Sequence, residues 1–197
     1  MKEILNYLSQ TYWKLTEEVM NYVLQNCDEL TIPKDKVLSE EGKVCGHVWF
    51  IKKGLLAAYQ EDPGDPTKNY CNWFMKENDI ATSVLSFFLE LRSAEKIVAL
   101  EDTVVFRMSK KDLFAGIQRY PGMAFLTLLI IIKYYCESTI NETFLRMKHP
   151  ELIFQHMLTT NHEVLQRALQ ADIASFLGVS EPIYRKIKSG KYKKKPK

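Results

Sequence analysis

The sequence predicts an α+β protein in which a β-rich body is followed by helices. Between Ile32 and Met108, short apolar and aromatic runs alternate with turn residues, which is typical of an antiparallel sandwich or barrel of about a hundred residues. From Met123 to Lys148 the chain carries a helical pattern without glycine or proline. The segment Gln170–Ile187 has the spacing of two short helices joined by a turn.

Charge is distributed unevenly along the chain. The 197 residues include 27 Lys and Arg and 24 Asp and Glu, a net charge of +3. Eight of the basic residues and none of the acidic ones lie between Pro182 and Lys197, so the rest of the chain carries −5. A basic end on an acidic body suggests a polyanionic partner, although a solubilising tail gives the same composition. The 46% apolar and 26% charged residues exclude disordered, collagen-like and disulfide-dense classes.

Cysteine usage and the chain start predict a cytoplasmic protein with reduced thiols. The four cysteines are scattered, and none forms a CxxC motif or a zinc-finger pair with histidine. The first residues do not have the pattern of a signal peptide. The apolar run Met123–Ile132 stops at Lys133, short of the ~20 residues needed to cross a bilayer, so we expect no membrane partner. Because the cysteines are scattered, we also expect no metal site.

The elements of the first half follow from caps, apolar runs and turns. Two helices are expected at 2–10 and 16–28, the second with Thr16 as N-cap and acidic residues in its first turn. Six strands are then predicted, at Val37–Leu38, Val48–Ile51, Leu55–Tyr59, Tyr70–Met75, Ile97–Leu100 and Val104–Met108. Turns are expected at Glu41–Gly42, Lys53–Gly54, Asp62–Pro66 and Glu77–Asp79.

A short helix is expected to begin at Ser109, with Asp112 completing a capping box, and to end near 120–122. The long helix at 123–148 then carries apolar residues at steps of four and three. We predict that they form the seam of a parallel dimer, although a buried core helix would show the same periodicity. The predicted dimerisation residues are Phe125, Leu129, Ile132, Cys136 and Ile140.

His149-Pro150 breaks the long helix and divides the chain into a sensor domain at 1–122, a dimerisation helix at 123–148 and a DNA-binding domain at 149–197. Helices are predicted at 150–160 and 170–189, with a polar connector at 159–163. In the second segment Gly178 suits the left-handed end of a first helix, and Ser180 suits the cap of a second. The inward-facing helix-turn-helix core is predicted to comprise Ile173, Ala174, Leu177, Gly178, Val179, Ile187 and either Ile183 or Tyr184.

The outer side of this helix pair is the candidate DNA-binding surface. Basic side chains on a second helix can meet phosphates and guanine edges in the major groove, and a lysine-rich tail adds salt-dependent phosphate contacts. A helical hairpin with a solvated basic face is the alternative interpretation. The predicted DNA-contacting residues are Ser180, Glu181, Arg185, Lys186 and Lys188.

Several stretches, in this order, resemble the cyclic-AMP receptor protein/fumarate-nitrate regulator (CRP/FNR) superfamily over nearly the whole chain. They are Lys34–Gly42, Val48–Gly54, Ala99–Thr103 and the helix-turn-helix core Ile173–Ser180. The resemblance implies a β-roll, or double-stranded β-helix, of cyclic-nucleotide-binding type, a dimerisation helix and a DNA-binding domain of a bacterial-type transcription regulator. It also implies RNA polymerase as a further partner.

The chain departs from this family at the effector site and at the C-terminus. Arg92-Ser93 resembles the family's phosphate-binding pair, but the preceding region, which includes Thr82 and Ser83, lacks the Gly-Glu pair that binds the ribose. Those four residues are the candidate effector site. We expect that cyclic AMP does not bind there in the way usual for the family, and we expect no cofactor. After Gly190 only seven residues remain, so we expect the final wing to be reduced or absent.

Three functions are candidates for a protein with this sequence. The first is a homodimeric DNA-binding transcription regulator with an unidentified small-molecule effector. The second is a small-molecule-binding module without DNA-binding activity. The third is an enzyme of the cupin type, which needs a cluster of His and Glu metal ligands. Because the β-rich body contains only His47, we expect no enzymatic activity.

Overall fold

Two four-stranded antiparallel sheets form the body of the protein. The computed structural model describes residues 1–62 and 64–192. One sheet has the strand order β1-β8-β3-β6 and the other β2-β7-β4-β5. The strands are β1 (Asp28–Ile32), β2 (Val37–Ser39), β3 (His47–Lys53), β4 (Leu56–Asp62), β5 (Asp65–Met75), β6 (Ile80–Ala81), β7 (Lys96–Ala99) and β8 (Thr103–Ser109).

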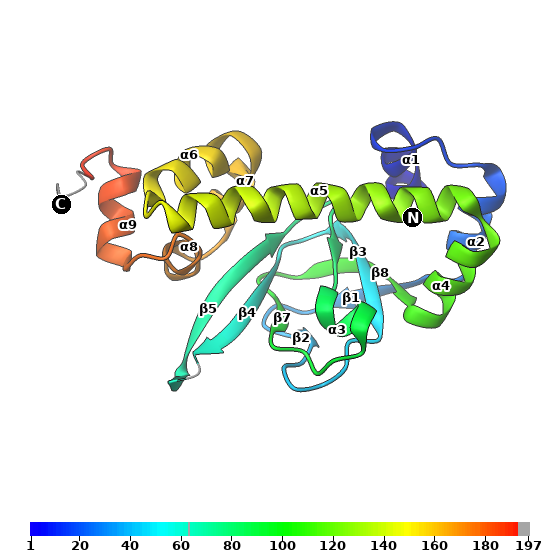
Figure 1. Ribbon diagram of the computed structural model, residues 1–197, viewed down its shortest axis with the longest axis horizontal. Helices are drawn as coiled ribbons and strands as arrows, with labels where there is room; N and C mark the ends of the chain where they lie inside the picture. The colour runs from blue at the N-terminus through cyan, green and yellow to red at the C-terminus, as the bar shows by residue number, and fades with distance from the viewer. Residues whose placement is uncertain (63, 193–197) are drawn as a thin grey trace.

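Nine helices among the described residues surround and extend this body. Figure 1 shows α5 crossing the sheets along the long axis of the molecule, with α1 and α2 towards one end and α6 to α9 at the other. The helices are α1 (Lys2–Thr11), α2 (Glu17–Gln25), α3 (Val84–Leu89), α4 (Lys110–Arg119), α5 (Pro121–Arg146), α6 (Pro150–Thr160), α7 (His162–Arg167), α8 (Gln170–Phe176) and α9 (Glu181–Lys188). This arrangement confirms the predicted α+β class.

Alternation along β4 explains how the sheet contributes to two separate cores. Leu56 and Ala58 point into the core between the sheets. Leu55, in the preceding turn, and Ala57 point to the other side, where they are fully buried in a cluster with residues of α6 to α9. Successive strand residues face opposite sides, so β4 is apolar on both faces because both faces are covered.

The turn from β3 to β4 requires glycine. Gly54 has φ of +117°, a region that residues with a Cβ rarely adopt. A Cβ at this position would also lie 2.7 Å from the Cα of Thr103. The Gly54 N–H donates to the Glu77 carboxylate at 2.7 Å, so this turn is tied to the one that follows β5.

The structure corrects several predicted boundaries. The helix predicted at 16–28 ends at Gln25, because Asp28 already begins β1 and pairs with Arg107. The connector predicted at 159–163 is partly helical, since α7 begins at His162. The break predicted at Asp62–Pro66 is shorter, because β5 begins at Asp65. Pro63, in this break, lies outside the described residues. Strands β1 and β6 and helices α3 and α7 were not predicted.

Two predicted caps are formed and a third is not. The side chain of Thr16 accepts a hydrogen bond from the Val19 N–H, and Ser109 accepts one from the Asp112 N–H. Ser180 occupies the N-cap position of α9, but its side chain makes no capping hydrogen bond there. Pro182 in the first turn of α9 has no N–H to satisfy, which reduces the need for that cap.

Helix α5 is apolar on several sides but little buried. Within the described part of the chain, it is the one helix long and apolar enough, by length and composition, to cross a membrane, with a mean hydropathy of 1.5. Polar contacts in its middle connect it to the sheets instead. Tyr134 accepts from the Ile80 N–H at 2.9 Å, and the Lys133 ammonium group donates to Asp79 at 3.0 Å. These contacts dock α5 along the β-roll.

Candidate nucleic-acid interface and effector site

Helices α8 and α9 are joined by a short turn that ends α8 in a left-handed residue. Gly178 has φ of +67°. The Val179 N–H donates to the Ala174 carbonyl at 3.0 Å, and the Gly178 N–H donates to the Ser175 carbonyl at 2.9 Å. This is the hydrogen-bond pattern of a Schellman motif, which satisfies the last carbonyls of a helix and reverses the chain. The predicted turn at Gly178 is therefore present.

The inward residues of this pair are deeply buried. Ile173, Ala174 and Leu177 on the α8 side, and Ile187 on α9, are 6% exposed or less. Between the two alternatives for α9, Tyr184 is the inward residue and is fully buried, whereas Ile183 remains 36% exposed. The Tyr184 ring packs edge-on against Phe154 of α6, with centroids 6.0 Å apart. Val179 is half-buried, and Gly178, which was predicted for the inward-facing core, is exposed in the turn.

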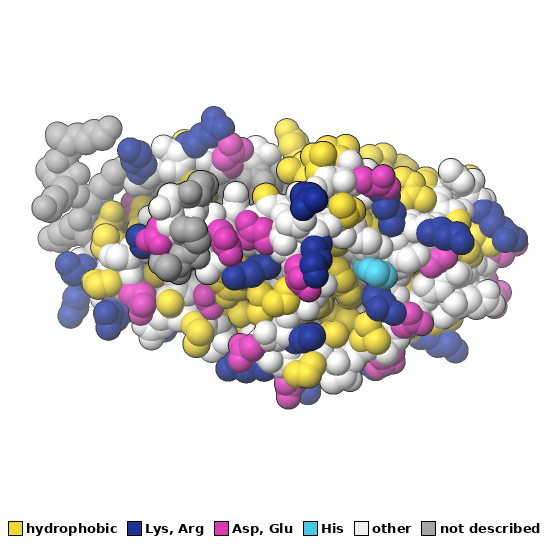
Figure 2. Space-filling view, turned by 90° about the horizontal axis from the view of Figure 1, so that it is seen from below, with side chains coloured by type: hydrophobic (Ala, Val, Ile, Leu, Met, Phe, Trp, Pro, Cys, Tyr) yellow, Lys and Arg dark blue, Asp and Glu magenta, His cyan; other side chains and the backbone are white. Residues whose placement is uncertain are grey.

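The predicted DNA-contacting residues lie together on the exposed side of α9. These residues are Ser180, Glu181, Arg185, Lys186 and Lys188, and all five are exposed. Figure 2 shows Lys and Arg side chains gathered at the end of the molecule that α9 occupies. The burial of Tyr184 and Ile187 orients the helix, since residues three apart share a face. The predicted tail residues Lys193, Lys194, Lys195 and Lys197 lie outside the described residues.

Four of the five residues predicted for the dimer seam are exposed on α5, and the neighbouring Leu128 and Tyr135 widen this exposed apolar face. Phe125 and Ile132 are 40% and 47% exposed, but the most exposed apolar side chains are Leu128 at 50% and Tyr135 at 72%. Leu129 is half-buried. We call Phe125, Leu128, Ile132 and Tyr135 the α5 stripe; its residues recur at steps of three, four and three. Of the other residues predicted for the seam, Cys136 and Ile140 are both exposed, and Ile140 also lines a cavity between α5, β5 and the C-terminal helices.

The four candidate effector residues lie near one another but are bonded mainly within the protein. Ser93 is buried, and its hydroxyl donates to the Glu95 carbonyl at 2.6 Å and shares a hydrogen bond of 2.8 Å with the Ser83 hydroxyl. The Thr82 hydroxyl donates to the His47 carbonyl at 3.0 Å. The Arg92 guanidinium is exposed and approaches the Gly42 carbonyl at 3.5 Å. None of the four lines the cavity between β5, α5 and the C-terminal helices, or the one formed by residues between 35 and 41 and Lys96.

The helical C-terminal part is docked on the outer face of β4 and β5. Phe74 of β5 contacts Phe176 of α8, with ring centroids 5.5 Å apart. The Cys71 N–H donates to the Ser175 hydroxyl at 2.9 Å, and Lys76 pairs with Glu163 at 2.7 Å. Sequence reasoning missed this interface. The apolar outer residues of β4 were its available signal, because a strand apolar on both faces must be covered on both.

A further interdomain contact joins Tyr59 of β4 to Asp172 of α8. Burial raises the pKa of Asp172, although its hydrogen bond with the Tyr59 hydroxyl opposes that effect. Burial and the neighbouring Asp172 carboxylate raise the pKa of Tyr59 far above its ordinary value. Both groups therefore keep their protons up to a higher pH than they would in water.

Groups of metal ligands are missing from the described residues. Across 1–62 and 64–192, no three His, Cys, Asp or Glu side chains are placed so that they could hold a metal ion. The four cysteines are free, and Cys45 and Cys71 are buried. Burial raises the pKa of the Cys27 thiol to about 12, so this thiol stays protonated and unreactive at neutral pH.

Comparisons with known proteins agree with this architecture. Residues 29–120 match the cyclic nucleotide-binding domain family. No curated protein matched the chain. The catabolite activator protein of Thermus thermophilus is a similar solved structure, with a TM-score of 0.58 at 16% identity over 93% of this chain and 85% of that one.

Two further regulators have a similar fold. The c-di-GMP-responsive global regulator CLP of Xanthomonas campestris has a TM-score of 0.68 at 12% identity, over 89% of this chain and 91% of its own. A protein of Eubacterium rectale that is described as a CRP/FNR-family transcriptional regulator has a TM-score of 0.66 at 13% identity, over 88% of this chain and 82% of its own. Through residues 29–120 the chain is similar to the cyclic nucleotide-binding domain family, and its fold is like that of solved CRP/FNR-family transcriptional regulators.

Proposed function

We propose that this protein is a homodimeric DNA-binding transcription regulator whose β-roll is an effector domain. The exposed basic side of α9 carries the proposal. Arg185, Lys186 and Lys188 project from the end of the molecule, while Tyr184 and Ile187 hold the helix from its other side. Arginine and lysine in this setting can bind phosphates and guanine edges, and Glu181 can accept from cytosine. We therefore assign α8 and α9 to a helix-turn-helix with α9 as the recognition helix.

Dimerisation through the α5 stripe supports the same role. An apolar stripe along a helix that the protein leaves exposed is a typical coiled-coil seam. Two copies paired in parallel along α5 would carry two recognition helices at the same end of the assembly. They could then enter successive major grooves about 34 Å apart at a pseudo-palindromic site. A regulator of this kind acts in the cytoplasm, and RNA polymerase stays a predicted partner.

We propose that the β-roll does not bind cyclic AMP in the way usual for the family and that its effector is a different small molecule. Ser93 already donates its hydrogen bond within the protein, and Arg92 points outward near Gly42. The segment before them lacks the glycine that would let a ligand approach the backbone closely. A cyclic nucleotide would have to displace these internal contacts before it could bind.

DNA binding can be tested with genomic fragments selected by the purified protein. We expect affinity that falls steeply with salt, and recovered sites with two half-sites one helical turn apart. The double variant Arg185→Ala/Lys186→Ala should lose specific binding while remaining dimeric. The matched control Lys34→Ala/Lys36→Ala, in the loop between β1 and β2, should bind as the wild type does.

Two results would overturn the proposal. One is a wild-type protein that selects no fragment and shows no salt-sensitive DNA binding. The other is unchanged binding by the α9 double variant. A thermal shift with a metabolite and no DNA affinity would instead favour a ligand-binding module.

A further inference from the structure

A cavity of about 400 Å³ lies where the three parts of the chain meet. The β-roll contributes Trp73 and Phe74 of β5 and the turn that follows them. Helix α5 contributes Lys133 and Glu137, and the C-terminal helices contribute His156 among others. Its volume is within the range of about 300–1,000 Å³ that is usual for small-molecule sites. It is distinct from the candidate effector residues of the β-roll, none of which lines it.

The charges in this cavity favour a cation. Four carboxylates and two ammonium groups line it. The carboxylate of Glu77 is paired with Arg167 at 2.8 Å, and both ammonium groups are also paired. Lys76 pairs with Glu163 at 2.7 Å, and Lys133 pairs with Asp79 at 3.0 Å. An anion would therefore have to break one of these ion pairs to find a positive partner.

Glu137 is the carboxylate left with the weakest compensation. Its oxygen is 3.8 Å from the Lys133 nitrogen, beyond hydrogen-bond distance, because that ammonium group is directed at Asp79. Burial raises the pKa of Glu137 above its ordinary value and the Asp79 carboxylate raises it further, although the Lys133 ammonium group and His156 partly oppose this. A bound cation would relieve both effects.

Aromatic and apolar side chains provide the rest of the wall. Tyr7, Trp73, Phe74 and Phe176 line the cavity, together with Ile140 and Met157. Aromatic faces attract cations as well as apolar groups. A carboxylate beside aromatic rings therefore suits a small organic ammonium ion with an apolar or aromatic body.

The cavity would stay open in the proposed dimer. Its α5 residues, Lys133, Glu137 and Ile140, follow each other at steps of four and three. Lys133 and Glu137 lie on roughly the opposite side of the helix from Leu128 and Tyr135 of the α5 stripe, because each residue turns the helix by about 100°. Ile140 lies nearer to Phe125 and Ile132, so a partner helix on that stripe would leave the Lys133 and Glu137 side of the cavity accessible.

We propose that this cavity binds a small organic monocation that acts as an effector. Such a ligand would contact the β-roll, α5 and the C-terminal helices at once, so it would bind one arrangement of these parts better than others. The regulatory role rests on the proposed function, whereas the binding site does not.

Binding can be measured by calorimetry without DNA, using tyramine, phenethylamine and choline as probes and 4-ethylphenol as the neutral analogue of tyramine. We expect saturable binding of at least one cationic probe and none of the neutral analogue. Glu137→Gln should weaken that binding by about tenfold or more. Ile140→Trp should abolish it by filling the cavity. Glu142→Gln is the matched control, because Glu142 pairs with Arg146 on the exposed side of α5 and does not line the cavity.

The site is refuted if all three cationic probes fail to bind, or if they bind Glu137→Gln or Ile140→Trp as they bind the wild type. Equal binding of 4-ethylphenol would refute the preference for a cation. The effector role is then tested by DNA affinity with and without the bound probe. An unchanged affinity would refute that role alone, and an absence of DNA binding would refute the proposed function while leaving the site intact.

Discussion

Arg167 of α7 donates two hydrogen bonds to Glu77 in the turn after β5, at 2.8 and 3.0 Å. The same guanidinium pairs with Glu101, in the turn between β7 and β8. One residue of the C-terminal part is therefore bonded to two turns of the β-roll. Planar, bidentate pairing of this kind fixes geometry as well as contributing energy, so Arg167 holds the C-terminal helices in one orientation.

Replacing Arg167 should release this contact. In Arg167→Met two partly buried carboxylates lose their cation, and we expect the free energy of unfolding to fall by about 1–3 kcal/mol. Urea denaturation at pH 7 measures the change. Arg146→Met is the control: its ion pair with Glu142 is largely exposed and should contribute less than about 0.5 kcal/mol. Equal losses in the two variants would show that Arg167 has no special role.

The same pair predicts a loss of stability in acid. Burial alone would raise the pKa of Glu77, but hydrogen bonds from Arg167 and the Gly54 N–H lower it below its ordinary 4.5. The folded protein therefore binds fewer protons at this group than the unfolded chain. Its stabilising contribution is present above pH 4.5 and is lost as the pH falls through the folded pKa.

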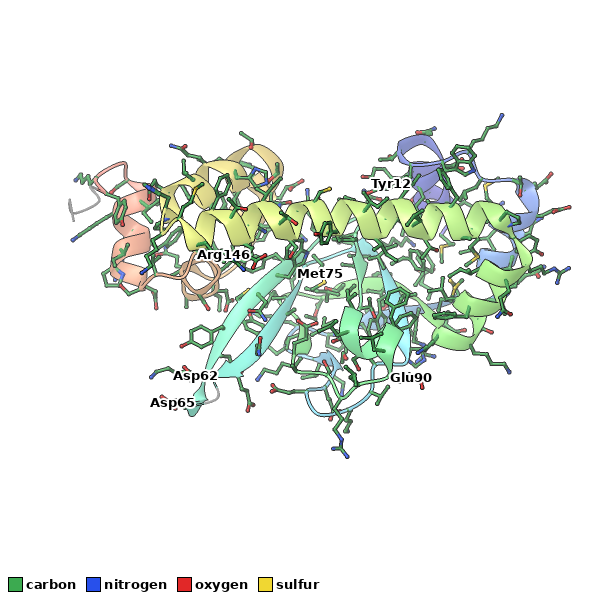
Figure 3. The ribbon with its side chains drawn as sticks, in the orientation of Figure 1. Tyr12, Asp62, Asp65, Met75, Glu90 and Arg146 are labelled. Carbon is green, nitrogen blue, oxygen red and sulfur yellow. The ribbon has the colours of Figure 1, made fainter. Side chains whose placement is uncertain are left out.

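Denaturation of wild type and Glu77→Gln across pH 3–7 tests this sign. The stability gap between the two proteins should be largest at neutral pH and should narrow in acid. A gap that widens as the pH falls would contradict the assignment. Figure 3 labels Asp62 and Asp65 at the far tip of the β4–β5 hairpin. Asp65→Asn therefore provides a carboxylate control distant from the interdomain contact.

Gly178 should resist substitution. At φ of +67° an alanine is strained, and its Cβ would lie 3.4 Å from Leu145. Gly178→Ala is expected to destabilise the protein by about 1–2 kcal/mol. Thermal unfolding can compare it with Gly46→Ala, where φ is not positive and a Cβ would meet nothing within 4 Å. If the two variants melt alike, the left-handed turn is not needed.

Charge placed on the α5 stripe should dissociate the proposed dimer. Leu128→Glu/Tyr135→Glu would bury two carboxylates of each copy at the seam, and we expect the dimer dissociation constant to rise by at least about a hundredfold. Sedimentation equilibrium provides the measurement. Leu89→Glu, on the exposed face of α3 and 62% exposed in the wild type, should leave association unchanged. A double variant that remains dimeric would place the interface elsewhere.

The sequence by itself determined the order of the parts and the local geometry of the α8–α9 turn. Gly178, Ala174 and Leu177 lie where their spacing predicted, because a helix end and its inward face are set by residues a few positions apart. The capping residues Thr16 and Ser109 were predictable for the same reason. The exposed basic residues of α9 also follow from local periodicity.

Only the tertiary structure decided which side of α5 stays exposed. The helix is apolar on several faces, so its periodicity did not distinguish the exposed Leu128 and Tyr135 from the half-buried Leu129. The choice depends on Asp79 and Ile80, which bind Lys133 and Tyr134 from more than fifty residues away in the chain. The contact between Arg167 and Glu77 joins residues 90 positions apart. Local patterns carry no information about such pairings, because these contacts form only when the β-roll brings distant segments together.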